Sequence, residues 1–116
     1  MDLDTVTEFR DAPGTSWQPG DAWLGGGTWL FSEPQPGLRR LLDLHAYGWA
    51  ALAERPEGLE IAATCTISEL AGWRPARPWP AARLAAQCTE ALLASFKVQN
   101  VATVGGNICL ALPAGA

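Results

Sequence analysis

The sequence is poor in the residues that bind metal ions. Its 116 residues include one histidine, His45, and three cysteines, Cys65, Cys88 and Cys109. Structural zinc and iron–sulfur clusters need several thiolate or imidazole ligands in recognisable spacings, so we predict no metal site on this chain. The odd number and long spacing of the cysteines predict no disulfide framework, and we expect each thiol to be buried and reduced.

Positive charge is also scarce, and long apolar runs are missing. Eight basic residues stand against twelve acidic ones, which gives a net charge of −4. This balance argues against electrostatic binding to nucleic acid or to an anionic membrane. No apolar run has the length of a transmembrane helix, and the first residues lack the charged and apolar regions of a signal peptide. We therefore expect a soluble, cytoplasmic protein.

What remains is the pattern of a mixed globular domain. Of the residues, 48% are hydrophobic and 17% are charged, which is ordinary for a folded protein. Short strands are predicted around residues 6–9, 22–24 and 59–63. Thr66 and Glu69 fit a capping box that opens a short helix ending near Gly72. Residues 73–80 contain three prolines and must be irregular, and residues 81–96 are rich in good helix formers. We expect an α/β fold that becomes α+β in its second part.

The predicted helix over residues 81–96 is the longest in the chain. One of its faces collects several side chains at helical spacing, namely Leu84, Cys88, Ala91, Leu92 and Ser95.

Two glycine segments carry the chemistry. The first is Gly25-Gly26-Gly27-Thr28, directly after a short apolar run, and the second is Gly105-Gly106 between Thr103 and Asn107. Successive backbone amides in a glycine turn can hold a phosphate without a large positive field, because no Cβ blocks the approach. Neither segment is a P-loop or the G-x-G-x-x-G of a dinucleotide-binding unit. From the residues alone, each segment is either a tight connection or a phosphate site.

The strings WLGGGTWL and VQNVATVGGNI resemble the two FAD-binding loops of the molybdopterin dehydrogenase FAD-binding domain, in the xanthine and carbon monoxide dehydrogenase family. The intervening LLDL and IAATCTISEL also resemble family segments, so the similarity runs from about Trp23 to the end of the chain. It favours a strand near residues 41–44 and implies a fold of the p-cresol methylhydroxylase type, incomplete at the C-terminus. The implied subdomains are residues 1–56, with the first loop, and residues 57–116, with the second.

In this family both loops hold the FAD pyrophosphate through backbone amides. The resemblance therefore implies a set of residues that bind FAD: Gly25, Gly26, Gly27, Thr28, Thr103, Gly105, Gly106 and Asn107. It implies that further residues line the same site: Trp23, Leu24, Trp29, Leu30 and Val104. Leu93 is expected to pack near the flavin. No residue is assigned a catalytic role.

By the same resemblance, this chain is the FAD-carrying component of an oxidoreductase. It would receive electrons from a molybdopterin-binding large subunit through an iron–sulfur small subunit. Three departures from the family stand out. Trp29 replaces a commonly polar residue, the position of a common acidic residue falls near Ala116, and the chain has less than half the usual length. We expect a fragment.

Two alternatives stay open. One is a flavoprotein oxidase or dehydrogenase of similar fold that works without molybdenum. The other is a non-catalytic binding or scaffold fragment, in which Trp73 and Trp79 would be exposed for docking. Of the remaining polar side chains, His45 is expected to be structural or at the surface. Arg39 and Arg40 are expected to be solvated, with a phosphate contact left open.

Overall fold

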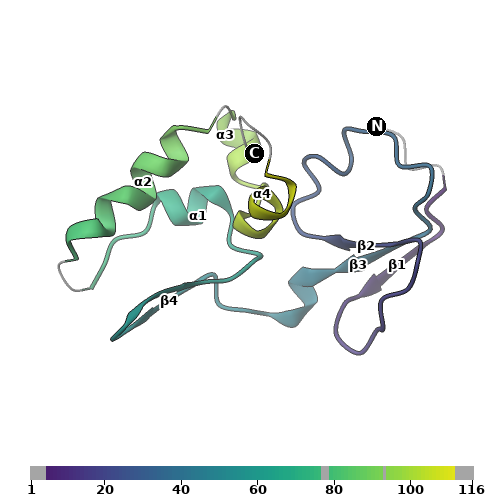
Figure 1. Ribbon diagram of the computed structural model, residues 1–116, viewed down its shortest axis with the longest axis horizontal. Coiled ribbons are helices and arrows are strands. Elements are labelled where there is room, and N and C mark those ends of the chain that lie inside the picture. Colours follow the sequence, from purple (N-terminus) through teal and green to yellow (C-terminus); the bar gives the residue numbers. More distant parts are fainter. Residues whose placement is uncertain (1–4, 77–78, 93, 112–116) are drawn as a thin grey trace.

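The structure is a computed structural model that describes residues 5–76, 79–92 and 94–111 (Figure 1). A three-stranded sheet lies at one end of the molecule, and helices and a hairpin lie at the other, with α4 between them. The strands are β1 Glu8–Asp11, β2 Asp21–Leu24, β3 Arg40–Asp43, β4 Leu52–Arg55 and β5 Gly58–Ile61. The helices are η1 Leu44–Tyr47, α1 Ile67–Ala71, η2 Pro80–Ala82, α2 Arg83–Glu90, α3 Phe96–Gln99 and α4 Val104–Leu110, where η marks a 3-10 helix.

The sheet is parallel and has the order β1-β3-β2. Its central strand β3 contains Leu41 and Leu42, both buried, as expected for a strand with neighbours on both sides. Because β2 and β3 run parallel, their carboxyl ends meet at one edge of the sheet. This edge brings the glycine segment after β2 next to η1, which follows β3, and the Nε2 atom of His45 lies 3.1 Å from the carbonyl oxygen of Gly25.

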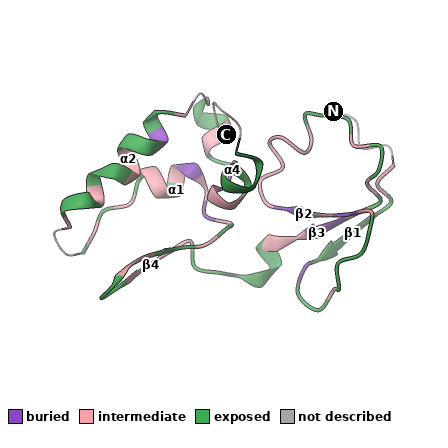
Figure 2. Ribbon diagram, viewed as in Figure 1, coloured by how far each residue is buried: buried purple, intermediate pink, exposed green. Residues whose placement is uncertain are grey.

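The second part consists of the antiparallel β4–β5 hairpin and the α-helices. The chain before α1 is joined to the chain before α4 by the isolated bridge between Thr66 and Thr103. The amide of Ile67 donates to the carbonyl oxygen of Ala102 at 2.9 Å. Cys65, Ile67, Ala102 and Thr103 are all buried, so this crossing is the centre of the second core (Figure 2).

Several local predictions are confirmed. β2 and β3 occupy the expected residues within one position, and β5 overlaps the predicted 59–63 segment but starts one residue before it. The capping box is present: the Thr66 hydroxyl accepts from the amide of Glu69, whose carboxylate accepts from the amide of Thr66. The first strand starts two residues later than expected, and β4 was not anticipated. The proposed boundary between residues 56 and 57 falls in the turn of the hairpin and stays a prediction.

The long helix predicted over residues 81–96 is wrong. A 3-10 turn precedes α2, which ends at Glu90, and Ser95 starts the separate helix α3 because its hydroxyl accepts from the amide of Val98. Of the side chains on the predicted face, Leu84 is 55% exposed and Cys88 is exposed, whereas Thr89, which is not on that face, is buried. Helix propensity is a weak prior, and here the local cap and the tertiary packing outweigh it.

The cysteines follow the prediction only in part. All three are free, and Cys65 is fully buried as expected. Cys88 and Cys109 are exposed, so the expectation of burial is wrong for both. Cys88 lies on α2 and Cys109 on α4, both at positions open to solvent, a placement that composition alone cannot reveal.

Arg39 and Arg40 differ in their exposure to solvent. Arg39 is exposed, as expected. Arg40 is not solvated, because its guanidinium pairs with the carboxylate of Asp21 at 2.6 Å, directly across the β2–β3 register. The side chains of Asp21 and Arg40 are 2% and 12% exposed, and this hydrogen-bonded partner lowers the pKa of Asp21.

Trp73 and Trp79 pack against each other rather than standing free, with ring centroids 5.7 Å apart. The indole nitrogen of Trp73 donates to the Glu54 carboxylate on β4 at 3.2 Å, and the amide of Ala76 donates to the same group at 2.8 Å. The pair therefore fastens the proline-rich segment to the hairpin, and the exposure that a docking role requires is not observed.

Within residues 5–76, 79–92 and 94–111, no helix has the length and apolar character needed to cross a membrane.

Candidate functional site

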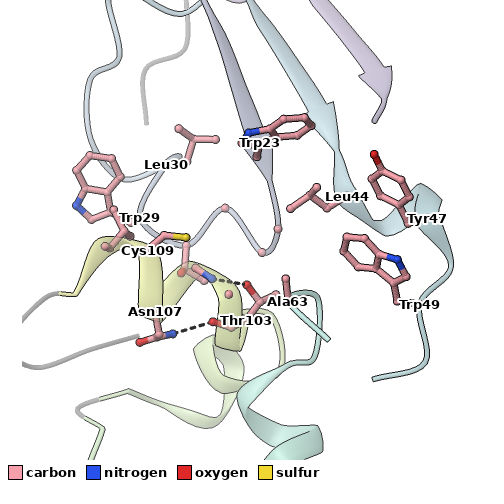
Figure 3. A pocket seen from close by; sticks show the side chains of 17 residues that line it. Trp23, Trp29, Leu30, Leu44, Tyr47, Trp49, Ala63, Thr103, Asn107 and Cys109 are labelled. Atoms are coloured by element: carbon pink, nitrogen blue, oxygen red, sulfur yellow. Dashed lines mark hydrogen bonds between the residues drawn. The ribbon is translucent and has the colours of Figure 1, made fainter. Parts of the chain in front are cut away.

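A cavity of about 620 Å³ lies between the carboxyl edge of the sheet and helix α4 (Figure 3). This volume is typical of a small-molecule or cofactor site. Most of the residues predicted for the site line it, namely Trp23, Gly25, Gly26, Gly27, Thr28, Trp29, Leu30, Thr103, Gly105, Gly106 and Asn107. The fold thus brings together two segments that are far apart in the sequence.

Two predicted residues stand apart from this lining. Leu24 is buried in the core beneath the first glycine segment, and Val104 does not reach the cavity wall. Leu93 lies outside the described residues.

Sequence reasoning missed several lining residues: Leu44, Tyr47, Trp49, Ala63, Cys109 and Leu110. A signal existed for some of them. Had the segment from Val104 been read as a helix, Cys109 and Leu110 would have fallen on the same face as Gly105 and Gly106, at helical spacing. Tyr47 and Trp49 carry no local signal, because their position depends on the parallel pairing of β2 with β3.

The first glycine segment packs directly on the strand-like chain before α4. A Cβ on Gly26 would overlap the carbonyl oxygen of Val101 and lie 2.7 Å from its carbonyl carbon, and a Cβ on Gly25 would lie 2.9 Å from the hydroxyl of Thr103. Gly27 has a φ of +74°, which side-chain-bearing residues rarely adopt. The glycines are therefore needed for a close approach of protein to protein, in addition to any approach of a ligand.

Among the described residues, the amides of the three glycines in this segment have no protein acceptor. None of the described hydrogen bonds has the backbone N–H of Gly25, Gly26 or Gly27 as its donor. Unpaired amides in succession attract anions, and the turn at Gly27 is of the kind that forms such concave sites. The first segment can therefore supply neutral donors to a phosphate group.

The second segment is not the glycine turn that the sequence predicted. It is the start of helix α4, with Thr103 as N-cap, whose hydroxyl accepts from the amide of Gly106 at 3.1 Å. The amide of Val104 donates to the carbonyl oxygen of Cys65 at 2.8 Å, and the amide of Gly105 donates to the carbonyl oxygen of Ala63 at 3.0 Å. The first-turn donors of α4 thus already have protein acceptors.

Gly105 has a packing role of its own. A Cβ at this position would lie 2.7 Å from the Cβ of Ala63 and 2.8 Å from its carbonyl oxygen. The side-chain amide of Asn107 donates to the carbonyl oxygen of Thr103 at 3.0 Å, which fixes its orientation beside the cavity. The second segment therefore shapes the cavity wall and holds it against the first segment.

The cavity lining carries no charged side chain among the described residues. It consists of glycine backbone, three hydroxyls, one thiol, one side-chain amide and a large apolar and aromatic surface. An anion bound here must be held by neutral dipoles, and planar apolar groups have aromatic walls to contact.

Figure 3 shows that the apolar and aromatic side chains form two groups in the cavity. Trp29, Leu30 and Cys109 lie on one side, and Leu44, Tyr47 and Trp49 lie on the other. A single cavity with glycine amides in its lining and apolar side chains in two groups suits a dinucleotide, whose two planar rings are joined by a diphosphate. Free amides, absent Cβ atoms and apolar flanks all fit such a ligand.

The geometry thus fits a dinucleotide-binding domain. The chain belongs to the family described as the FAD-binding domain in molybdopterin dehydrogenase, whose sequence model matches residues 3–116. Its cofactor is FAD, and at this level it is a flavoprotein of an oxidoreductase family. No curated protein and no solved structure matches the chain significantly.

Proposed function

We propose that the cavity holds FAD with the pyrophosphate at the first glycine segment. The observation that carries the proposal is the set of amides at Gly25, Gly26 and Gly27 that have no acceptor among the described residues and that line a cavity without charged side chains. Thr28 adds a hydroxyl on the same wall. The predicted residues of the second segment, Thr103, Gly105, Gly106 and Asn107, close the opposite wall.

The chain's own groups bind and orient the cofactor; no described residue is assigned a step in the chemistry. Bound FAD supplies reversible electron transfer. Trp29 and Leu30 on one side and Leu44 on the other provide apolar surface to exclude water from the rings. The Asp43 carboxylate accepts from the amide of His45 at 3.0 Å, which holds η1 and its His45 ring against Gly25. This contact positions the loop for the pyrophosphate.

At a finer level, we propose that this is the FAD component of an oxidoreductase of the xanthine dehydrogenase type. Its partners would be a molybdopterin-binding large subunit and an iron–sulfur small subunit, from which electrons reach the flavin. The p-cresol methylhydroxylase type of fold, the subdomains 1–56 and 57–116, and a cytoplasmic location belong to the same proposal. The family match supports it, as do the two glycine segments that meet across the cavity.

Of the alternatives, neither is favoured by a specific observation. A scaffold role called for free tryptophans at positions 73 and 79, but these two rings pack together and one is hydrogen-bonded to Glu54. A flavoprotein without molybdenum remains a rival for the activity of the whole enzyme. Copurification of the chain with molybdopterin-containing and iron–sulfur polypeptides distinguishes the two.

The test of cofactor binding is a visible absorption spectrum of the purified chain after addition of FAD and removal of the excess. We expect retained flavin in near-equal amount to protein, and FAD as the released species. NAD is the matched control, because it has the same adenylate and diphosphate without the isoalloxazine ring. A chain that retains no flavin at any FAD concentration contradicts the proposal.

A further inference from the structure

Tyr47 and Trp49 form a stacked aromatic pair at the cavity. Their ring centroids are 4.6 Å apart and their planes differ by 3°. Both residues line the cavity, and both remain largely exposed, Tyr47 by 43% and Trp49 by 46%. Trp23, on the same cavity, is 49% exposed. Large aromatic side chains are seldom left open to water in a group, so this cluster marks a surface that a ligand covers.

The place of the pair in the fold connects it to the bound cofactor. Tyr47 ends η1, and η1 follows β3, whose carboxyl end is next to that of β2 and its glycine segment. The His45 ring of η1 contacts Gly25 directly. A diphosphate at Gly25–Gly27 therefore leaves one end of the dinucleotide beside Tyr47 and Trp49, and the other beside Trp29 and Leu30 (Figure 3).

We propose that the Tyr47–Trp49 pair is a stacking platform for one of the two planar rings of FAD. This inference rests on the proposed function and adds an affinity-determining wall to the site. The rings already lie parallel, so a third planar ring can extend the stack without a rotamer change. Stacking of a planar ring on an aromatic side chain does not depend on the identity of the base, and it is strong enough to change affinity by about ten-fold or more.

The experiment replaces Trp49 and Tyr47 by leucine, singly, and measures the dissociation constants of FAD, ADP and FMN by calorimetry. Leucine keeps the apolar character and removes the flat ring. We expect Trp49→Leu to weaken FAD binding by about ten-fold. We expect the same variant to weaken only one of the half-ligands. Loss of ADP binding identifies the adenine ring as the stacked group, and loss of FMN binding identifies the isoalloxazine ring.

Two controls separate stacking from folding. Trp17→Leu removes a 51% exposed tryptophan that is not on the cavity, and it should leave all three affinities unchanged. Tyr47→Phe keeps the ring and should retain wild-type affinity. Unchanged FAD binding in both leucine variants overturns the inference, as does a loss of FAD affinity without a loss for either half-ligand. A wild-type chain that does not bind FAD instead overturns the proposed function, and the inference with it.

Discussion

Gly26 and Val101 are in such close contact that a Cβ on Gly26 would overlap the carbonyl oxygen of Val101. This contact joins the first glycine segment to the chain that leads into α4. The two predicted cofactor loops are therefore in direct contact with each other, with no ligand needed to bridge them. Substitutions in them must be separated into those that prevent this contact and those that act on the cavity alone.

Replacement of Gly26 by alanine should destabilise the folded chain. The new Cβ lies 2.7 Å from the carbonyl carbon of Val101, so the two segments must separate, at a cost of about 1–3 kcal/mol for such overpacking. Urea unfolding measures the change. Gly106→Ala is the matched control, because its Cβ would have only the Thr103 hydroxyl nearby, at 3.2 Å. Equal stabilities of the two variants would contradict the packing described here.

The three thiols should react at different rates with a thiol-specific reagent. Cys65 is fully buried, and burial, with a smaller contribution from the Glu69 carboxylate, raises the pKa of its thiol, so it should react slowest. Cys88 and Cys109 are exposed and should react quickly.

FAD should protect Cys109 from the reagent, because Cys109 lines the cavity. Cys88, on α2 away from the cavity, is the internal control and should react at the same rate with and without FAD. Mass spectrometry of labelled peptides assigns each rate. Protection of Cys88, or equal labelling of Cys109 in both conditions, would place the bound FAD elsewhere.

Loss of the Thr103 hydroxyl should weaken α4. This hydroxyl is the N-cap of the helix and accepts from the amide of Gly106 at 3.1 Å. Thr103→Ala should lower the free energy of unfolding by about 1 kcal/mol, the usual value of such a cap. Thr103→Ser keeps the acceptor and should retain most of the stability. A serine variant as unstable as the alanine variant would show that the methyl group, and not the cap, matters.

The Asp21–Arg40 pair should make stability depend on pH in the acid range. The hydrogen bond to Arg40 lowers the pKa of Asp21 below its ordinary value of 3.8. A lowered carboxyl pKa stabilises the fold above the unfolded value, and this contribution is lost as the pH falls through the folded one. Asp21→Asn should therefore be less stable than the wild type at neutral pH, with a difference that shrinks below about pH 4.

Unfolding midpoints in urea, measured across this range, test the prediction. Glu8→Gln is the control, because the pair of Arg10 and Glu8 is at the surface, with side chains 58% and 50% exposed, and contributes little. A stability difference between Asp21→Asn and the wild type that does not change with pH would mean that the Asp21–Arg40 pair is not the source of the pH dependence.

The features that depend on residues close together in the chain could be predicted from the sequence. The Thr66–Glu69 capping box, strand β2 and the two glycine segments were predictable, because each rests on a few adjacent side chains or on backbone freedom. Strand β3 was predicted from the family resemblance. The FAD family was predictable for the same reason, since its motifs are contiguous strings.

Only the tertiary structure decided which of these residues share a surface. The parallel pairing of β2 with β3 places Tyr47 and Trp49 on the cavity, and it buries Arg40 against Asp21. The end of α2 at Glu90 and the exposure of Cys88 and Cys109 were likewise set by packing. Burial and pairing depend on contacts between residues distant in the chain, and local propensity carries no information about them.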